Sequence, residues 1–138
     1  MAANTLPISP IAPAISWNGA PLTAANTAMD GTGTVATIFT AGANGSRVGR
    51  LRVVHRGTNV ATVMRFFVNN GSSNATPGNN DLIAEITVAA NTLSQVAASI
   101  FQDVNINCVL KQGYKLNYTI GTAVAAGHSV DAIDAGDY

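Results

Sequence analysis

Two histidines are the side chains of this sequence best suited to acid–base chemistry. His128 lies directly before Ser129 and three residues before Asp131. A catalytic triad needs a nucleophile, a base and an orienting acid that converge from separate elements, whereas neighbours in a predicted turn do not converge. His55 shares a predicted strand face with Leu51 and Val53 and is expected to pack in a core or an interface. The histidines therefore indicate no hydrolase.

The carboxylates are few, and their spacing fits no metal site. Asp131, Asp134 and Asp137 recur every three residues. A calcium loop needs oxygen ligands at alternate positions around a glycine turn and a closing bidentate acid, which this segment lacks. It is predicted to be a solvated acidic end, or a contact with basic residues of a neighbouring subunit. We expect no enzyme activity, no metal and no cofactor.

The single cysteine, Cys108, excludes an internal disulfide and any metal site built from several cysteines. Its place among alternating apolar residues predicts burial as a small apolar side chain. The stretch Gly31-Thr32-Gly33 lacks the third glycine and the lysine of phosphate-binding loops. We interpret this stretch as a turn.

The distribution of charge is unusual. All five arginines lie between residues 47 and 65, and no acid lies between residues 31 and 80. Arg50, Arg52 and Arg56 are predicted to share one face of a strand. Three interpretations are open: a solvated face paired with Glu85 and its neighbours, a protein interface, or a nucleic-acid contact. The aromatic residues that stack on bases are missing from this face, so we expect no direct nucleic-acid binding.

The elements that position these residues must be built with little charge. The chain has 138 residues, of which 47% are apolar and 10% are charged, against about 25% charged in an average globular protein. This length fits one domain with its own core. No apolar run is long enough to span a membrane. The first 30 residues lack the pattern of a signal peptide.

Residues 1–21 are predicted to form an extended arm. Four prolines in this stretch fix the backbone and remove hydrogen-bond donors. The arm carries no charge but several large apolar side chains, which favours docking on a partner. The candidates for this contact are Ile8, Ile11, Ile15 and Trp17. Residues 22–138 would then form the folded domain.

From about residue 34, apolar and polar residues alternate between Gly- and Asn-rich breaks, which is typical of β-strands. The first two and the last two predicted strands are expected to pair as hairpins. Leu82, Ala84, Ile86 and Val88 are expected to share one strand face. The predicted strands are 50–56, 60–68, 81–88, 104–110 and 114–120, and residues 69–80 form a long polar loop.

Residues 92–101 fit two structures. Leu93, Val96 and Ile100 have helical spacing, and Thr92 with Gln95 fits a capping box. A strand is also open, because alternate residues are apolar, and the surrounding strands favour it. Seven or eight short strands predict an all-β chain, a single β-sandwich or jelly-roll-like domain with an extended N-terminal arm.

Three stretches resemble small β-sheet virion proteins of tailed bacteriophages. They are RLRVVHRGTNVATVMRFFVNNGSS (50–73), DLIAEITVAANTLSQ (81–95) and VNINCVLKQGYKLNYTIGTAVAAGHSVDAIDAGDY (104–138). The pattern Leu-x-x-Gly-Tyr-Lys-Leu, followed by an Ala/Gly-rich segment and a final Gly-Asp-Tyr, carries most of the likeness.

The resemblance implies a non-enzymatic structural protein, most similar to a capsid decoration (cement) protein. Such a protein would be made in the cytoplasm of the bacterial host. It would sit on the head surface of the virion as a homotrimer and bridge neighbouring subunits of the major capsid protein.

Two alternatives stay open. The chain could be a tail, neck or fibre-associated virion subunit, which copy number in the particle would distinguish from a decoration protein. It could also be a carbohydrate-binding β-sandwich module. Such modules normally present aromatic platforms, and this sequence has one Trp and three Tyr.

Overall fold

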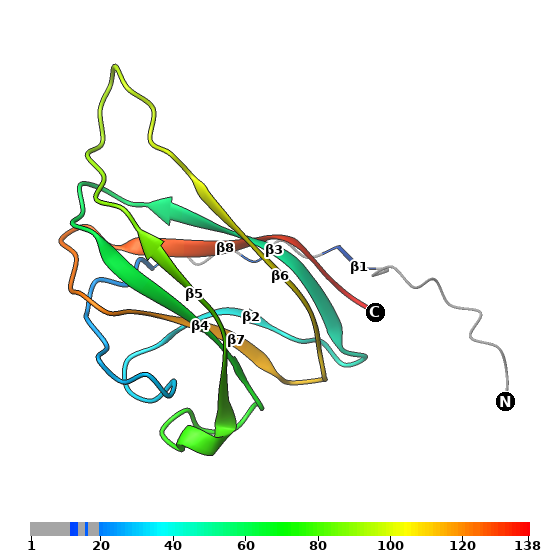
Figure 1. The fold of residues 1–138 in the computed structure, drawn as a ribbon. Helices are drawn as coiled ribbons and strands as arrows, with labels where there is room; N and C mark the ends of the chain where they lie inside the picture. Colours follow the sequence, from blue (N-terminus) through cyan, green and yellow to red (C-terminus); the bar gives the residue numbers. More distant parts are fainter. Residues whose placement is uncertain (1–11, 14–15, 17–19) are drawn as a thin grey trace, which may run out of the picture.

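The computed structural model describes residues 12–13, 16 and 20–138, which form two antiparallel four-stranded sheets packed face to face (Figure 1). The predicted all-β sandwich is confirmed. Sheet A contains, in spatial order, β1 (Ala12–Pro13), β8 (His128–Asp137), β3 (Ser46–His55) and β6 (Gln102–Leu110). Sheet B contains β2 (Ala36–Thr40), β7 (Lys115–Ile120), β4 (Thr62–Asn69) and β5 (Asn80–Val88). One 3-10 turn, Pro77–Asn79, precedes β5.

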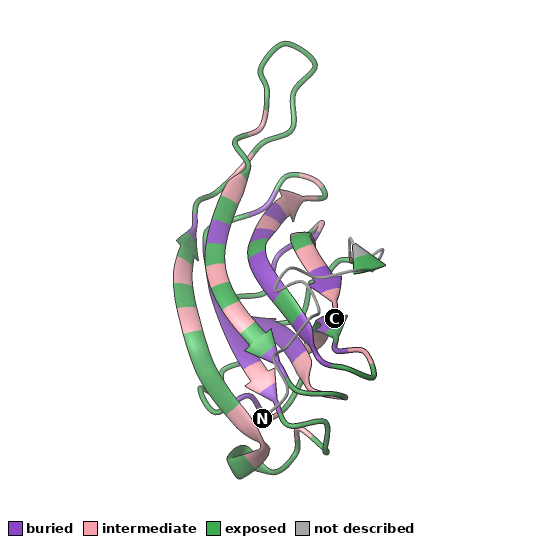
Figure 2. Cartoon of the chain, turned by 90° about the vertical axis from the view of Figure 1, so that its right-hand side faces the viewer, coloured by how far each residue is buried: buried purple, intermediate pink, exposed green. Residues whose placement is uncertain are grey.

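The core lies between the sheets because strands β2 to β8 turn apolar side chains inward. Figure 2 shows buried positions among exposed ones along several strands. Burial of each large aliphatic side chain stabilises the fold by about 1.5–3 kcal/mol before the ordering cost. Cys108 packs against this core and is half-buried, as its alternation predicts. Core side chains include Val48, Leu51, Val53 and Val130 of sheet A, and Ile38, Met64, Phe66, Leu116, Tyr118 and Ile120 of sheet B.

Both hairpin predictions are wrong. The strands predicted at 50–56 and 60–68 correspond to β3 and β4, which lie in different sheets, and β6 and β7 also lie in different sheets. Of strands consecutive in sequence, only β4 and β5 pair directly among the described residues. A strand with one apolar face can bury this face in either of two positions: beside the preceding strand in the same sheet, or opposite it in the other sheet. The apolar periodicity of the sequence is the same in both cases and does not distinguish them.

A β-bulge in β5 overturns the orientation predicted for Leu82. Phe66 lies opposite Ala84, whereas its neighbour Phe67 lies opposite Leu82, so one residue of β5 is extra. The extra residue, Ile83, shifts the alternation and leaves Leu82 45% exposed. Ala84, Ile86 and Val88 keep the inward orientation that was predicted.

The segment predicted to be an acidic end is a central strand. β8 pairs with β3 on one side and β1 on the other. Asp131 lies opposite Arg52 and Asp134 opposite Arg50, so three steps along β8 match two along β3. This register shift accounts for the three-residue step from Asp131 to Asp134, which breaks the alternation expected of a strand. An adjacent register shift, between Val48 and Arg50, leaves Gly49 against Asp134, where a Cβ would collide with the carboxylate.

Residues 92–101 are neither helix nor strand. They belong to loop 89–101, which joins β5 to β6 and projects from one end of the sandwich (Figure 1). The apolar residues at helical spacing have no surface to pack against. Isolated helices shorter than about 12–15 residues are marginal in water, and a lone strand has no pairing partner.

The polar loop at the opposite end, residues 70–79, is ordered by asparagine side chains. Asn79 Nδ2 donates to Ser73 O (2.8 Å), and Asn74 Nδ2 donates to Gly33 O (3.0 Å). Asn80 Nδ2 donates to Asn74 O (3.0 Å), while Asn69 Nδ2 donates to Asn80 Oδ1 (2.8 Å). These bonds join the loop to the turn around residues 31–33, where Gly31 has φ +78°.

The described part of the predicted arm runs along β8 of its own domain. Ala12 lies opposite Asp137. Ser16 exchanges backbone hydrogen bonds with Ala132 (3.2 and 2.8 Å). Ile8, Ile11, Ile15 and Trp17 lie outside the described residues. At the positions described, the chain is therefore an edge strand of sheet A.

Candidate interaction surface

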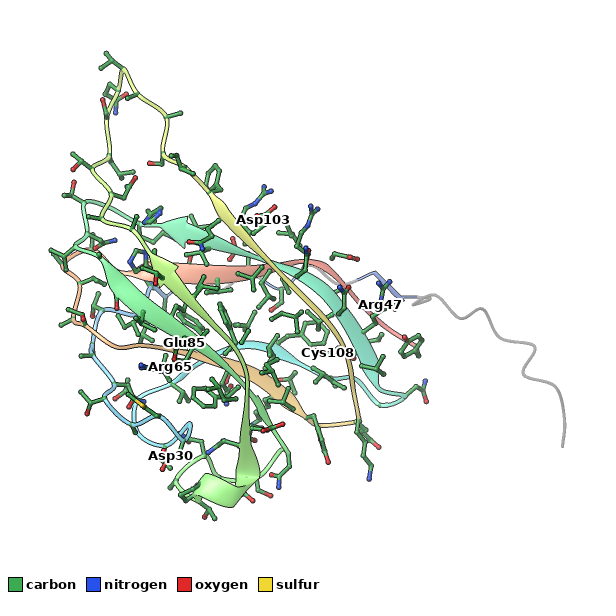
Figure 3. All side chains as sticks on the ribbon, viewed as in Figure 1. Asp30, Arg47, Arg65, Glu85, Asp103 and Cys108 are labelled. Atoms are coloured by element: carbon green, nitrogen blue, oxygen red, sulfur yellow. The ribbon has the colours of Figure 1, made fainter. Side chains whose placement is uncertain are left out.

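The predicted arginine stripe lies on the outer face of sheet A and is paired within the chain. Arg52 makes a bidentate contact with Asp103, with Nε–Oδ1 at 2.7 Å and Nη2–Oδ2 at 2.9 Å. Arg50 Nη1 lies 3.7 Å from the same carboxylate. The Arg52 guanidinium also stacks 5.5 Å from the ring centre of Phe101. Figure 3 shows Asp103 at the loop end of β6 and Arg47 towards the opposite end of this face.

The third arginine of the stripe points to a different partner. Arg56 Nε donates to Ser129 Oγ (2.8 Å) on β8. Glu85, which was expected to pair with the stripe, lies in sheet B and accepts from Arg65 Nε at 2.7 Å instead (Figure 3). The expected partner was wrong because the two sheets could not be assigned from sequence. Among the described residues, the acid that pairs with Arg50 and Arg52 is Asp103 of β6.

Electrostatics fit this pairing. The hydrogen bond from Arg52 holds the pKa of Asp103 below its ordinary value, and Asp103 in turn raises the pKa of Arg52. Both groups are close to solvent, where an ion pair contributes little to stability. These ion pairs hold the side chains of Arg50 and Arg52 on the outer face of sheet A. Positive charge remains accessible on this face, because Arg47 and Arg50 are exposed there.

Loop 89–101 is the most apolar exposed segment in the described part of the chain. It contains no charged residue. Leu93 is 48% exposed, Val96 96%, Ile100 83% and Phe101 56%. Figure 2 shows the loop exposed along almost its whole length. Exposed apolar side chains that gather in one place are typical of contact surfaces.

A cleft of about 320 Å³ opens at the root of this loop. No charged side chain lines it. Its lining includes His55, Ala89, Asn91, Ala98, Ile100 and Phe101. The backbone of Asn91 exchanges two hydrogen bonds of 2.9 Å with Asn59. Asn91 Nδ2, in contrast, is buried with no hydrogen-bond partner among the described residues.

Two histidines close the same end of the sandwich. His55 and His128 lie opposite each other on β3 and β8, with their rings edge to face at 4.9 Å. His128 is fully buried, and neither ring nitrogen has a partner among the described residues. Burial, together with the neighbouring His55, lowers the pKa of His128 to about 4. Both rings are therefore neutral packing groups near pH 7, as was predicted for His55.

The backbone around His128 is held by a buried phenol. Tyr118 OH donates to His128 O at 2.9 Å, and burial raises the pKa of Tyr118 to about 12. His128 also exchanges backbone hydrogen bonds with Leu22. The histidine begins a strand rather than occupying the predicted turn, and Ser129 hydrogen-bonds to Arg56 rather than to His128.

A second, wider cleft of about 500 Å³ lies at the other end of β6. Ala43, Asn44, Val109 and Lys111 are among its lining residues. Val109 is 69% exposed there and lies opposite Arg47.

Within the described residues, no group of three or more His, Cys, Asp or Glu side chains could hold a metal ion. The same part of the chain contains no helix that could cross a membrane.

Sequence reasoning located the arginine stripe but missed the apolar loop. The helical spacing of Leu93, Val96 and Ile100 drew attention to periodicity, whereas the informative signal was the absence of any charge from residue 86 to residue 102. Comparison with known proteins adds no assignment: no protein-family model, curated protein or solved structure matches this chain.

Proposed function

We propose that this chain is a non-enzymatic structural virion protein that decorates and stabilises a bacteriophage capsid. It would act as a homotrimer on the head surface, bridging neighbouring subunits of the major capsid protein. The observation that carries the proposal is a β-sandwich with an uncharged, apolar loop exposed at its end. Such a surface fits lasting contact with other proteins better than turnover of a substrate.

The order of the strands in the two sheets supports a jelly roll. The spatial orders 1-8-3-6 and 2-7-4-5 place successive strands in alternate sheets, apart from the β4–β5 hairpin. Eight strands in two four-stranded sheets are the double-sheet arrangement of jelly rolls, which are common in viral capsid proteins and lectins. The sequence resemblance to small virion proteins favours the first of these classes.

The lectin class provides the alternative, a carbohydrate-binding module. This alternative rests on the same strand order together with the cleft beside Phe101. Among the described residues, Phe101 is the one aromatic side chain among the large exposed apolar ones. A sugar platform usually needs more stacking surface, so the structural role is preferred. Binding to a glycan array at micromolar concentration would reverse this preference.

Electron microscopy of the particle tests the main proposal. In purified virions of the phage that encodes the chain, we expect density for it in many symmetric copies over the head. Density confined to the tail, neck or fibre base would replace the decoration role with the tail-associated one. Absence from the virion would refute both.

A truncation tests whether the predicted arm docks on a partner. Because Ala12 and Pro13 pair with β8, a deletion that extends past residue 11 would also expose an edge of sheet A. Removing residues 2–11 should leave the thermal transition unchanged and sharply reduce occupancy on particles. Full occupancy after this deletion would show that Ile8 and Ile11 make no contact that matters for docking.

A further inference from the structure

We propose that the cleft at the root of loop 89–101 binds the proline-rich N-terminal segment of a neighbouring copy of this chain. The segment is residues 5–11, Thr-Leu-Pro-Ile-Ser-Pro-Ile, which lies outside the described residues. The inference rests on the proposed function for the presence of neighbouring copies, and it assigns the receptor surface that the proposed function leaves open.

The chemistry of the segment restricts what can receive it. Pro7 and Pro10 have no N–H group, so the segment offers mainly carbonyl acceptors and apolar side chains. The spacing Pro-x-x-Pro suits an extended polyproline helix, which docks on apolar grooves that contain aromatic rings. The receptor surface should therefore be uncharged and apolar, with an aromatic wall and a hydrogen-bond donor.

The cleft has these properties. Ala89, Ala98 and Ile100 supply apolar walls, and Phe101 supplies an exposed aromatic ring. Asn91 supplies the donor, because its Nδ2 is buried without a partner among the described residues. A buried donor without a hydrogen bond destabilises the fold. If the Asn91 amide rotates, its Nδ2 can donate to a backbone carbonyl that precedes a proline of the segment, and this bond removes the destabilisation.

Distance indicates that the segment in the cleft comes from a neighbouring copy and not from the same chain. Ala12 lies opposite Asp137 at one end of β8, whereas the cleft residue His55 lies opposite His128 at the other end. The nine steps between them span about 30 Å at about 3.3 Å per residue. Ile8 precedes Ala12 by four residues and can extend at most about 14 Å from it. Ile8 therefore cannot reach the cleft of its own chain.

The resulting contact is head to tail. Figure 1 shows β1 beside the C-terminus and loop 89–101 at the opposite end of the sandwich. A segment that leaves one end and docks at the other end of the next copy makes a heterologous interface, which closes into a ring when the rotation permits. A trimer is one such closed ring.

Disulfide trapping tests the contact in purified full-length protein. In a Cys108→Ser background, one preparation carries Ile8→Cys and a second carries Ala98→Cys, and the two are mixed with oxidised glutathione. We expect a cross-linked heterodimer that forms at least tenfold faster than with Asn44→Cys, a matched exposed position on the cleft at the other end. Thr92→Cys replaces Ala98→Cys if the latter changes the thermal transition.

Further variants test the chemistry of recognition. Phe101→Ser in the receptor copy and Pro7→Ala with Pro10→Ala in the donor copy should each slow cross-linking several-fold, whereas Val96→Ser at the loop tip should not. Cross-linking no faster than the Asn44→Cys control would overturn the proposal. So would an intramolecular disulfide in a chain that carries both Ile8→Cys and Ala98→Cys.

The outcomes separate this inference from the proposed function. Rapid cross-linking by a protein that is absent from virions would uphold the cleft and refute decoration. Decoration of particles by a protein that does not cross-link would do the reverse.

Discussion

The two loops that flank β5, residues 70–79 and 89–101, differ in almost every physical property. Loop 70–79 is polar, and its asparagine side chains hydrogen-bond to one another and to backbone carbonyls. Loop 89–101 is uncharged and exposes Leu93, Val96, Ile100 and Phe101. Beyond its root, the hydrogen bond described for it is from Val96 N to Ser94 Oγ.

This difference indicates which contacts stabilise each loop. Loop 70–79 satisfies its own backbone and the turn at 31–33, so it is complete within one chain. Loop 89–101 leaves apolar side chains exposed to water, and under the proposed function a partner covers them. Changes at the first loop should therefore alter the stability of the fold, and changes at the second should alter association.

The largest effect is expected from acid at the histidine end. Above about pH 6.5, His128 is neutral in both the folded and the unfolded chain. Since its folded pKa is about 4, only the unfolded chain binds the proton between these values, and stability falls as pH falls through this window. The full loss is about 3 kcal/mol, measured by urea unfolding at pH 7 and pH 4.

A control identifies the group responsible. His128→Phe keeps a buried ring but cannot titrate, so it should flatten this pH dependence. Hydrogen exchange should show the Asn59–Asn91 pair opening in acid before the bonds of loop 70–79. An unchanged slope in His128→Phe would assign the effect to another group.

The second effect concerns the polar loop. Asn80→Ala removes hydrogen bonds to Asp30 O and Asn74 O and leaves Asn69 Nδ2 buried without its acceptor. We expect a loss of about 1–3 kcal/mol in the free energy of unfolding. Ser94→Ala in loop 89–101 is the matched control and should cost less than about 0.5 kcal/mol. Equal losses would abolish the contrast between the loops.

The third effect isolates association. Val96→Ser combined with Ile100→Ser should change the free energy of unfolding by no more than about 0.5 kcal/mol, because both side chains are exposed. Light scattering of the concentrated protein should show a smaller oligomer, and occupancy on particles should fall. A stability loss with unchanged association would mean that the loop packs on its own domain.

The smallest effect is expected on the outer face of sheet A. Arg52→Gln breaks the pair with Asp103, but both groups are exposed, so the unfolding midpoint should hardly move. Binding to duplex DNA should be undetectable with or without the substitution. Tight binding that weakened steeply between 50 and 200 mM salt would instead indicate phosphate contacts.

Strand positions could be predicted from the sequence because alternation reports burial of one face. Leu51, Val104 and Leu116 are buried where period 2 places them. Pairing could not be predicted, because the partners of β3 are β6 and β8, both more than 45 residues away in the sequence. The bulges at Ile83 and beside Asp134 break the alternation locally, which explains the wrong face for Leu82 and the missed strand β8.

The candidate surface could be predicted only in part. Arg50, Arg52 and Arg56 share an outer face as their spacing indicates, but their partners come from other strands. Asp103 and Ser129 could not be identified without the sheet order. The cleft beside Phe101 depends on how loop 89–101 leaves β5 and enters β6, which no local pattern encodes.

The position of β8 between β1 and β3 has a consequence for synthesis. During translation, β3 and β6 emerge from the ribosome long before residues 128–137, and until then β3 has an open edge where β8 belongs. Pairings this distant in sequence form slowly, and an unpaired edge can associate with other nascent chains. We therefore expect the domain to mature only after residues 128–137 have emerged, and ribosomes stalled before residue 128 to carry chains that aggregate or recruit chaperones.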